Sequence, residues 1–497
     1  MNFGSPPPKL RASALQEPSF KRAQQIWKEL NDRFGVHSYV KYQKVLGFGG
    51  FGMVQQWSTF NLDGTKGEDI AVKGTTDDAA LISGLQDEIY WTKIFKNSEH
   101  LMQLRDIPLH PSTIDLYEKL LTRDISVWQN NENHPQPVMV MEVMRHGALA
   151  QLIHRVSTAR TYYNPRTSRN EDKLVEFIPN RILWRLLLCM VRSCLGMAFP
   201  EPTNVPQQPS GSAMGIIPKP PLYREEFRSD IPPRPIVHFD LDVQNVFLGE
   251  IDISGVDQEH NVFPISKIAD YGLMVYWQDS WTLVQKDMYS SGGKAPYKAP
   301  EHLSRGRLNE AGIYGPQTNV WGVGLTLFSC ITLTFDFDNA PGASKGRTLS
   351  GSGRYITTYG HALLGSPASG PLPASYADVD LELRETVARC LHSNHLERPK
   401  LDELLKICLR NIASDDRYAP ASAPAPAAGQ PNREYELRPR LGQVESNALL
   451  WRFTNDYFLN AAPPQDAYEP HWRNLLPKSD LDWTLVQKDG TAGTMTV

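Results

Sequence analysis

Two carboxylates and an amide lie close together in residues 238–245, which read H-F-D-L-D-V-Q-N. Asp240 and Asp242 are of the type that can receive a proton, and Asn245 is of the type that can help to hold a metal ion. A proline-rich loop precedes this stretch and a short apolar run follows it. Short patterns of this kind are common, so the meaning of these residues depends on the segments that would position them.

A glycine-rich segment lies far upstream and reads G-F-G-G-F-G-M-V over residues 47–54. Glycine lets a backbone turn sharply and approach phosphate oxygens, because no Cβ intervenes. In a dinucleotide-binding fold such glycines open a helix. Here a predicted strand over residues 42–46 precedes them, and a second strand with an Asp-Gly turn at residues 63–64 follows them. The pattern therefore favours a flap between two strands that covers phosphates.

The next segments could supply a cation and its acidic partner. Residues 70–73 read I-A-V-K, so Lys73 ends an apolar strand, and the predicted helix 79–95 carries Glu88. Lys73 could instead be an edge-strand lysine in water, and Glu88 a solvated helix carboxylate. Residues 102–104 are predicted to begin another strand. Residues 138–144, V-M-V-M-E-V-M, could edge a nucleotide pocket or form an ordinary apolar strand. The order of these segments after the glycines favours the functional interpretation of Lys73.

Four further motifs follow residues 238–245 in the chain. They read D-Y-G at residues 270–272, G-K-A-P-Y-K-A-P-E at 293–301, T-N-V-W-G-V-G-L-T-L-F at 318–328 and L-E-R-P at 396–399. Together with the earlier segments they resemble the motifs of the eukaryotic protein kinase superfamily, in that family's order, over roughly residues 40–412. The resemblance also implies an ion pair between Arg398 and Glu301.

The resemblance implies an α+β, two-lobed protein-kinase-like fold. A small antiparallel β-sheet lobe with one helix would precede a larger, mainly helical lobe. The expected divisions are an N-terminal extension (1–39) with a helix over residues 18–34, a small lobe (40–144), a large lobe (145–412) with an insertion (200–235), an Ala/Pro-rich linker (413–440) and an aromatic tail (441–497).

By resemblance, Asp240 and Lys73 are the catalytic residues. Asp240 would orient the substrate hydroxyl and receive its proton, while Lys73 would bind phosphates of ATP with Glu88 behind it. Asn245 and Asp270 are implied to hold Mg²⁺. The residues implied to surround the nucleotide are Gly47, Gly49, Gly52, Val54, Ala71, Lys73, Glu88, Met141, Glu142 and Met144. ATP and Mg²⁺ are therefore the implied cofactors.

Four residues depart from the kinase pattern. Phe239 replaces the Arg that usually reads a phosphorylated activation segment, and Asp242 replaces the Lys that usually contacts the γ-phosphate. Lys294 stands where Ser/Thr kinases usually have Thr. Asn319 replaces an Asp that braces the backbone of the catalytic loop, and an amide can still form hydrogen bonds there although it lacks the charge.

The change at Asp242 reverses a charge beside an anionic phosphate. At about 4 Å and an effective dielectric constant near 20, one unit-charge interaction is about 4 kcal/mol. Each 1.36 kcal/mol is about tenfold in rate, so an uncompensated Asp242 would cost about a thousandfold or more. Asp242 pointing away, or Lys294 reaching in, would compensate. Asp242→Lys is predicted to raise turnover.

Two functions follow from the resemblance. The first is an ATP- and magnesium-dependent protein kinase, which would transfer the γ-phosphoryl group to a Ser/Thr hydroxyl of a protein substrate. The second is a pseudokinase, a nucleotide-binding or scaffold domain that regulates a partner protein. The glycine-rich segment together with Lys73, Asp240, Asn245 and Asp270 favours the first.

The overall composition bounds these functions. The 497 residues carry a formal net charge of -4, so a general nucleic-acid-binding surface is not expected. Five cysteines without C-x-x-C spacing argue for a reducing compartment and against a disulfide framework or a zinc knuckle. The N-terminus has no apolar run like a signal peptide. Arg185 and Arg192 interrupt the most apolar helix candidate, 182–199, which lies in the long buried helix expected over 178–199. We therefore expect no membrane span and an intracellular protein, cytoplasmic or nuclear.

Overall fold

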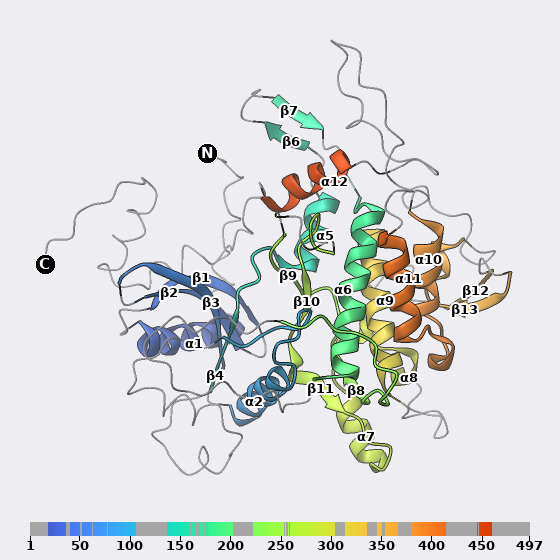
Figure 1. Cartoon of the computed structure of the whole chain (residues 1–497). Helices are drawn as coiled ribbons and strands as arrows, with labels where there is room; N and C mark the ends of the chain where they lie inside the picture. The colour runs from blue at the N-terminus through green and yellow to red at the C-terminus, as the bar shows by residue number, and fades with distance from the viewer. Residues whose placement is uncertain are drawn as a thin grey trace, which may run out of the picture. The chain divides into compact units, whose positions relative to one another are not determined.

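Figure 1 shows the computed structural model of the 497-residue chain. The described residues are 18–35, 40–49, 52–61, 63–76, 78–105, 137–158, 161–164, 169–172, 175, 177–201, 222–252, 254, 257, 259–303, 314–334, 345–349, 353–365, 379–413, 445 and 447–459. The chain divides into two compact units, with residues 1–86, 105–143 and 462–497 in the first and 87–104 and 144–461 in the second. Residues 414–440 of the predicted linker and 460–497 of the predicted tail lie outside the described residues.

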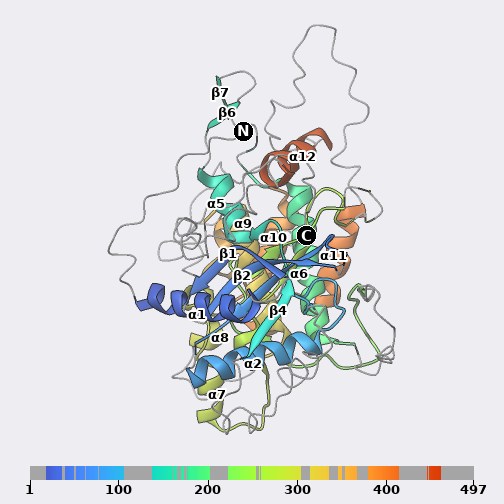
Figure 2. The ribbon, with the colours of Figure 1, turned by 90° about the vertical axis from the view of Figure 1, so that its left-hand side faces the viewer.

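A four-stranded antiparallel sheet is the main feature of the first unit. Its strand order is β1 (Val40–Gly49), β2 (Gly52–Phe60), β3 (Lys66–Gly74) and β4 (Val138–Glu142). Helix α1 (Pro18–Phe34) packs against β1 and β2 (Figure 2). Its apolar residues recur at helical spacing, and Phe20, Ile26 and Leu30 are buried in one core with strand residues. The N-terminal helix therefore completes the core of this unit.

Helices dominate the second unit. Helix α6 (Asn180–Ala198) packs against both α9 (Pro316–Thr332) and α11 (Leu401–Ala413), and α10 (Leu381–Cys390) packs on α9 (Figure 1). Every residue of α6 is buried, its arginines included. A helix that is largely apolar on all sides is expected in the interior of a large unit. This helix therefore forms the core on which the neighbouring segments are built.

The remaining elements of the second unit are short. They are α2 (Ala79–Ile94) from residue 87 onward, β5 (Gly147–Ala148), α5 (Leu149–Thr158), β6 (Thr161–Asn164), β7 (Arg169–Asp172), α7 (Leu283–Ser290), α8 (Pro300–Leu303), β12 (Gly346–Leu349), β13 (Tyr355–Thr358) and α12 (Asn447–Thr454). None of the helices in the described ranges has the length and apolar character needed to cross a bilayer. All five cysteines belong to this unit, and each is buried as a free thiol.

Two pairs of short strands flank the segments that carry Asp240 and Asp270. Strand β8 (Ile236–His238) pairs with β11 (Met274–Tyr276), and β9 (Val246–Leu248) pairs with β10 (Ser266–Ile268), both antiparallel. β8 and β9 lie at the two ends of the first segment, and β10 and β11 lie at the two ends of the second. The pairing therefore brings the two segments side by side.

The predicted long elements agree with the structure, whereas one short strand was wrongly predicted. The helices expected at Pro18–Phe34, 79–95 and 178–199 correspond to α1, α2 and α6. Residues 102–104 are not a strand, because Leu101 forms only an isolated bridge and the N–H of Met102 bonds a carbonyl oxygen and the hydroxyl of Tyr271. The described residues form an α+β structure that is compatible with a two-lobed kinase-like fold.

Residues 445 and 447–459 belong to the second unit, and Phe453 is buried there. Glu445 is also fully buried, and its carboxylate accepts hydrogen bonds from the backbone N–H groups of Asn180 (2.6 Å) and Arg181 (2.9 Å). The first N–H groups of a helix have no acceptor inside that helix. Burial raises the pKa of Glu445 to about 7, although these donors favour its charged form. Glu445 thus caps the N-terminus of α6.

Candidate active site

The sheet of the first unit brings four of the predicted nucleotide-binding residues onto one face. Val54 lies opposite Lys73 in the β2–β3 ladder, and Ala71 lies opposite Met141 in the β3–β4 ladder. Residues that oppose each other, and residues two apart in one strand, share a face of a sheet. Lys73 and Ala71 are such a pair, so all four side chains emerge on the same side. Val72 emerges on the other face, in the core that includes α1.

The three predicted glycines lie at the adjoining ends of β1 and β2, with Gly47 and Gly49 in β1 and Gly52 at the start of β2. A Cβ on Gly47 or Gly49 would meet nothing within 4 Å, so the backbone there is open to an approaching group. Gly52 has a φ of +147°, and a Cβ there would lie 2.3 Å from the carbonyl oxygen of Gly74. Any larger residue at Gly52 would therefore push β2 away from β3 at the end of the ladder where Gly52 lies beside Gly74.

The other residues predicted to surround the nucleotide belong to both units. Glu142 lies in the first unit, whereas Glu88 and Met144 lie in the second. Glu88 is 4% exposed on α2, while the neighbouring Asp87 is half-buried. The carboxylate of Glu142 pairs with Arg105 at 3.2 Å. The resemblance implies that the backbone of Glu142, and not this carboxylate, would contact adenine.

Asn319 of α9 fixes the backbone at the start of residues 238–245, here called the Asp240 loop. Its Oδ1 accepts a hydrogen bond from the N–H of His238 (2.9 Å), and its Nδ2 donates to the carbonyl oxygen of Ile236 (2.8 Å). An amide both accepts and donates, whereas an ionised carboxylate only accepts. The lost charge at this position is therefore accompanied by a hydrogen bond that an aspartate could not make.

His238 links the Asp240 loop to the strand end that precedes Asp270. The N–H of Asp240 donates to Nδ1 of His238 (3.2 Å), so Nε2 must carry the proton that is donated to the carbonyl oxygen of Ala269 (3.1 Å). The ring also packs edge-on against Tyr271, with centroids 6.0 Å apart. A neutral imidazole thus holds the two segments together.

Asn245 joins the two ends of the Asp240 loop. Its Nδ2 donates to the carbonyl oxygen (2.7 Å) and to Oδ2 (2.9 Å) of Asp240. The backbone carbonyl oxygen of Asn245 accepts a hydrogen bond from the N–H of Ala269 (2.9 Å). This contact brings Asp270, the residue after Ala269, beside Asn245. Because Nδ2 is engaged with Asp240, the amide oxygen of Asn245 is the atom that could bind a cation.

Asp270 adopts a backbone conformation that few residues other than glycine adopt. Its φ of 62° and ψ of 69° lie in the left-handed region, which Asp tolerates better than most residues. Such conformations are concentrated at functional sites. The carboxylate of Asp270 and the amide oxygen of Asn245 are hard oxygen donors, the ligand type that Mg²⁺ prefers. The donor set therefore fits the metal that the resemblance implies.

Lys294 places its ammonium group between the two carboxylates of the Asp240 loop. Its Nζ lies 3.0 Å from Oδ2 of Asp240 and forms a shorter ion pair with Oδ2 of Asp242. Burial raises the pKa of the fully buried Asp242, and the hydrogen bond from Lys294 opposes this. Burial lowers the pKa of Lys294, but Asp242 and Asp240 outweigh it, so the net pKa is raised. A lysine from another segment thus neutralises the reversed charge of Asp242.

Gly293 permits this approach of the chain. Its φ is +82°, and a Cβ there would lie only 2.1 Å from the carbonyl oxygen of Phe239. A side chain at this position would be both strained and in collision with the loop. Beside it, the N–H of Lys294 donates to Oδ1 of Asp240 at 3.1 Å. Glycine is therefore required where residues 270–301, here called the Lys294 segment, touch the Asp240 loop.

Aromatic rings surround Phe239 on the other side of the loop. We call Phe239, Trp277, His302 and Tyr314 the Phe239 cluster. The ring of Phe239 lies 5.1 Å from that of His302 and 5.4 Å from that of Tyr314, centroid to centroid. Burial lowers the pKa of His302 to about 4, and neither of its ring nitrogens has a hydrogen-bond partner among the described residues. Apolar packing therefore stands where the kinase pattern has a charged arginine.

A buried ion pair lies at the end of the Lys294 segment. Arg398 donates through its two terminal nitrogens to Oε1 (2.8 Å) and Oε2 (2.7 Å) of Glu301. Two parallel hydrogen bonds fix orientation as well as distance. The guanidinium also lies over the ring of Trp321, 5.1 Å from its centroid. The ion pair predicted between Arg398 and Glu301 is confirmed.

Sequence reasoning found the loop residues but not most of their partners. It named a reach of Lys294 toward Asp242 as one of two ways to offset the reversed charge, and the structure contains that contact. It did not single out Trp277, His302 or Tyr314. The only signal for these residues in the sequence is their aromatic type, which many core residues share.

The described geometry can be compared with known proteins. No protein-family model matches this chain. Over 112 residues it is 35% identical to the serine/threonine protein kinase OSK3 of Oryza sativa subsp. japonica, which covers 22% of this chain and 18% of the relative. Over 107 residues it is 30% identical to the hormonally up-regulated neu tumor-associated kinase of Homo sapiens, which covers 21% of this chain and 12% of the relative.

The chain thus spans less than a fifth of the length of the curated relatives it matches. Both relatives are kinases by name. These partial matches, together with the α+β structure, support a kinase-like relationship.

Proposed function

We propose that this protein is an ATP-dependent protein kinase that transfers the γ-phosphoryl group of ATP to a Ser/Thr hydroxyl of a protein substrate. The observation that carries the proposal is the ammonium of Lys294 between Asp240 and Asp242. The kinase pattern has a lysine at position 242, and here a lysine from position 294 brings the positive charge to the same loop. The expected penalty of the Asp242 substitution is therefore offset.

Asp240 is proposed as the residue that orients the substrate hydroxyl and receives its proton. Its carboxylate is held by Asn245, by the N–H of Lys294 and by the ammonium of Lys294, so little reorganisation is needed when a substrate arrives. The ammonium of Lys294 would also attract the negative charge of the transferring group. Positioning and neutralisation of charge are the main requirements of phosphoryl transfer.

The remaining proposed roles concern ATP and Mg²⁺. Asn245 and Asp270 would hold Mg²⁺, which supplies neutralisation of charge on the phosphates. Lys73 would bind phosphates, and the open backbone at Gly47 and Gly49 would cover them. The domain division at residues 40–412, with a small lobe over 40–144 and a large lobe over 145–412, belongs to the same proposal.

A pseudokinase is the second candidate, and one observation favours it. Both carboxylate oxygens of Asp240 already accept hydrogen bonds from this chain, from Asn245 and from Lys294. A carboxylate so engaged would be a weaker proton acceptor. In that case the chain would bind ATP without transferring its phosphate, and would act on a partner protein through its surface.

Phosphate transfer by the purified full-length chain tests the proposal. The chain is incubated with labelled ATP, Mg²⁺ and casein, and phosphoamino-acid analysis separates Ser/Thr from Tyr products. Asp240→Asn and Lys73→Met are expected to lower transfer at least about a hundredfold. The matched controls Asp279→Asn and Lys96→Met change exposed residues and should retain activity.

Equal transfer by the wild type, Asp240→Asn and Lys73→Met would contradict the kinase proposal. Nucleotide binding by the wild type without transfer to casein or to itself would support the pseudokinase instead. Phosphotyrosine as the sole product would contradict the Ser/Thr assignment.

A further inference from the structure

Two histidines and a cysteine form a buried cluster in the second unit, among residues with no role in the proposed active site. His100 follows α2, Cys189 lies on α6 and His260 precedes β10. Their exposed fractions are 0%, 1% and 3%. Nε2 of His100 lies 3.2 Å from Nε2 of His260, and Sγ of Cys189 lies 3.4 Å from Nε2 of His260. One ligand atom from each residue lies within 4.8 Å of the others.

The outer nitrogens of the two rings are both engaged with carboxylates. Nδ1 of His100 lies 2.6 Å from Oε2 of Glu225, and Nδ1 of His260 lies 2.5 Å from Oδ2 of Asp257. A carboxylate accepts, so each Nδ1 carries a proton. In the neutral rings, the two Nε2 atoms then turn lone pairs toward each other across 3.2 Å, which is unfavourable unless something positive lies between them.

This arrangement is the one that metal-binding histidines adopt. Such histidines donate the second ring N–H to a carboxylate or carbonyl, which fixes the tautomer and the ring orientation. With Zn–N of about 2.0–2.1 Å and Zn–S of about 2.3 Å, a tetrahedral zinc ion separates two nitrogens by about 3.3 Å and a nitrogen from a sulfur by about 3.5 Å. The observed separations of 3.2 Å and 3.4 Å fit without movement of the chain.

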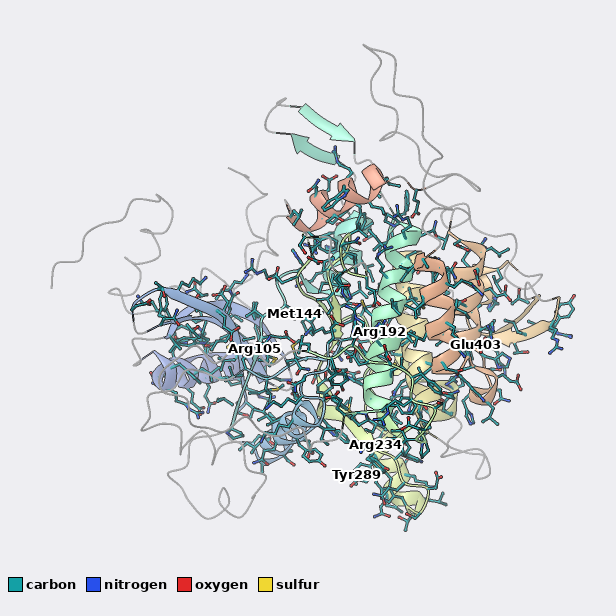
Figure 3. All side chains as sticks on the ribbon, viewed as in Figure 1. Arg105, Met144, Arg192, Arg234, Tyr289 and Glu403 are labelled. Atoms are coloured by element: carbon teal, nitrogen blue, oxygen red, sulfur yellow. The ribbon has the colours of Figure 1, made fainter. Side chains whose placement is uncertain are left out.

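The charges around the cluster also suit a divalent cation. Arg192 lies on α6 (Figure 3). It binds Glu259 at 2.6 Å, and Arg224 binds Glu99 at 2.8 Å. The negatively charged residues around the cluster are Glu99, Glu225, Asp257 and Glu259, and the positively charged residues are Arg192 and Arg224. Four negative and two positive charges leave a net charge of -2. One Zn²⁺ would balance that charge before the Cys189 thiolate is counted.

We propose that His100, Cys189 and His260 bind a structural Zn²⁺ ion, with water at the fourth position. Mixed nitrogen and sulfur donors are the set that zinc accepts in tetrahedral sites. The ion would join three segments that are far apart in sequence: the stretch after α2, the central helix α6 and the turn before β10. It would therefore fix the C-terminal end of α2 to the core of the second unit, independently of any phosphate transfer.

Elemental analysis of the full-length chain, purified without chelator or added metal, tests the proposal. About one zinc per chain is expected in the wild type. Cys189→Ala should lose most of this zinc, whereas Cys194→Ala should retain it. Cys194 is the matched control because it is an equally buried thiol on the same helix. A zinc chelator should lower the unfolding midpoint of the wild type and of Cys194→Ala, but not that of Cys189→Ala.

A second measurement covers the case in which Cys189→Ala does not fold. The wild-type chain is stripped of metal and reconstituted with Co²⁺, and its absorption is recorded. Thiolate-to-cobalt charge transfer together with the intense visible bands of tetrahedral Co²⁺ is expected. Absence of zinc with no cobalt–thiolate band would overturn the proposal, because the histidines would then share a proton instead. Copper in place of zinc, or equal zinc in both cysteine variants, would also overturn it.

Discussion

The two sides of the Asp240 loop contact neighbouring segments through different forces. On one side, the ammonium of Lys294 lies between Asp240 and Asp242, and this lysine is 40% exposed. On the other side, Phe239 is buried against the rings of His302 and Tyr314. The charged side contacts the carboxylate that is proposed to act on the substrate, and the aromatic side does not.

This difference separates two tasks that a single arginine and its phosphorylated partner combine in the kinase pattern. Apolar packing holds the loop at any ionic strength, because salt does not screen it. The charged side can then adjust the electrostatics of Asp240 without also carrying the packing. Variants on the two sides should therefore change different quantities: stability on the aromatic side and turnover on the charged side.

Removal of the Phe239 ring should give the largest effect. Phe239→Ala is expected to lower the free energy of unfolding by about 3–5 kcal/mol, because a buried aromatic ring leaves a cavity. Tyr276→Ala, which removes an exposed ring on β11, should change it by less than about 0.5 kcal/mol. Denaturant unfolding at low and high salt measures both, and a Phe239→Ala effect that depended strongly on salt would break the comparison.

Removal of the Lys294 charge should give the second-largest effect. Lys294→Met leaves the buried carboxylate of Asp242 without its cation, so transfer to casein is expected to fall about a hundredfold, or about 2.7 kcal/mol in activation free energy. Lys286→Met on α7 changes a half-buried lysine of the same segment and should retain activity. Steady-state kinetics with folded protein, checked by circular dichroism, is the measurement. Unchanged turnover in Lys294→Met would show that the charged side does not serve the chemistry.

Variants that change the charges of Asp242 and Lys294 together test the charged side more closely. Sequence reasoning alone predicts that Asp242→Lys raises turnover, but the observed contact leads us to expect a fall, because two ammonium groups would then face each other. Asp242→Lys combined with Lys294→Thr restores the usual kinase residues at both positions. The double variant should be more active than either single variant, with a coupling of about 1–3 kcal/mol. Additive losses would mean that the two residues act independently.

Acidification should give the smallest effect, on the aromatic side. Burial lowers the pKa of His302 from 6.5 to about 4 in the folded protein, so folding favours the neutral ring. Its contribution to stability is complete above pH 6.5 and is lost as the pH falls from 6.5 toward 4. Between about pH 7.5 and 5, the wild type should lose about 1–2 kcal/mol more than His302→Phe, which does not titrate. Parallel losses in urea unfolding would contradict this assignment.

Sequence reasoning predicted the parts of this molecule that depend on local patterns. The bounds of α1 follow from helical spacing, and the Arg398–Glu301 pair follows from two recognisable motifs. Contacts between segments distant in the chain could be predicted only where recognisable motifs identified the residues that pair. Residues 102–104 were mistaken for a strand, because the pairing with β10 is limited to an isolated bridge at Leu101, and the N–H of Met102 is shared between the carbonyl oxygen of Ile268 and the hydroxyl of Tyr271.

The His100–Cys189–His260 cluster illustrates the limit most clearly. Its members lie in three separate segments, and no C-x-x-C spacing marks them. The sequence argument against a zinc knuckle covers only ligands that are close in sequence. Convergence of distant side chains is a property of packing around α6, which periodicity cannot show.

The capping of α6 by Glu445 has a consequence for where this protein can be shortened. A chain that ends at Ala413 would keep every residue of the proposed active site, but it would leave the first N–H groups of a wholly buried helix without the Glu445 carboxylate. Buried donors without acceptors cost about 1–3 kcal/mol each. The shortest piece that contains the chemistry is therefore shorter than the shortest piece that folds well.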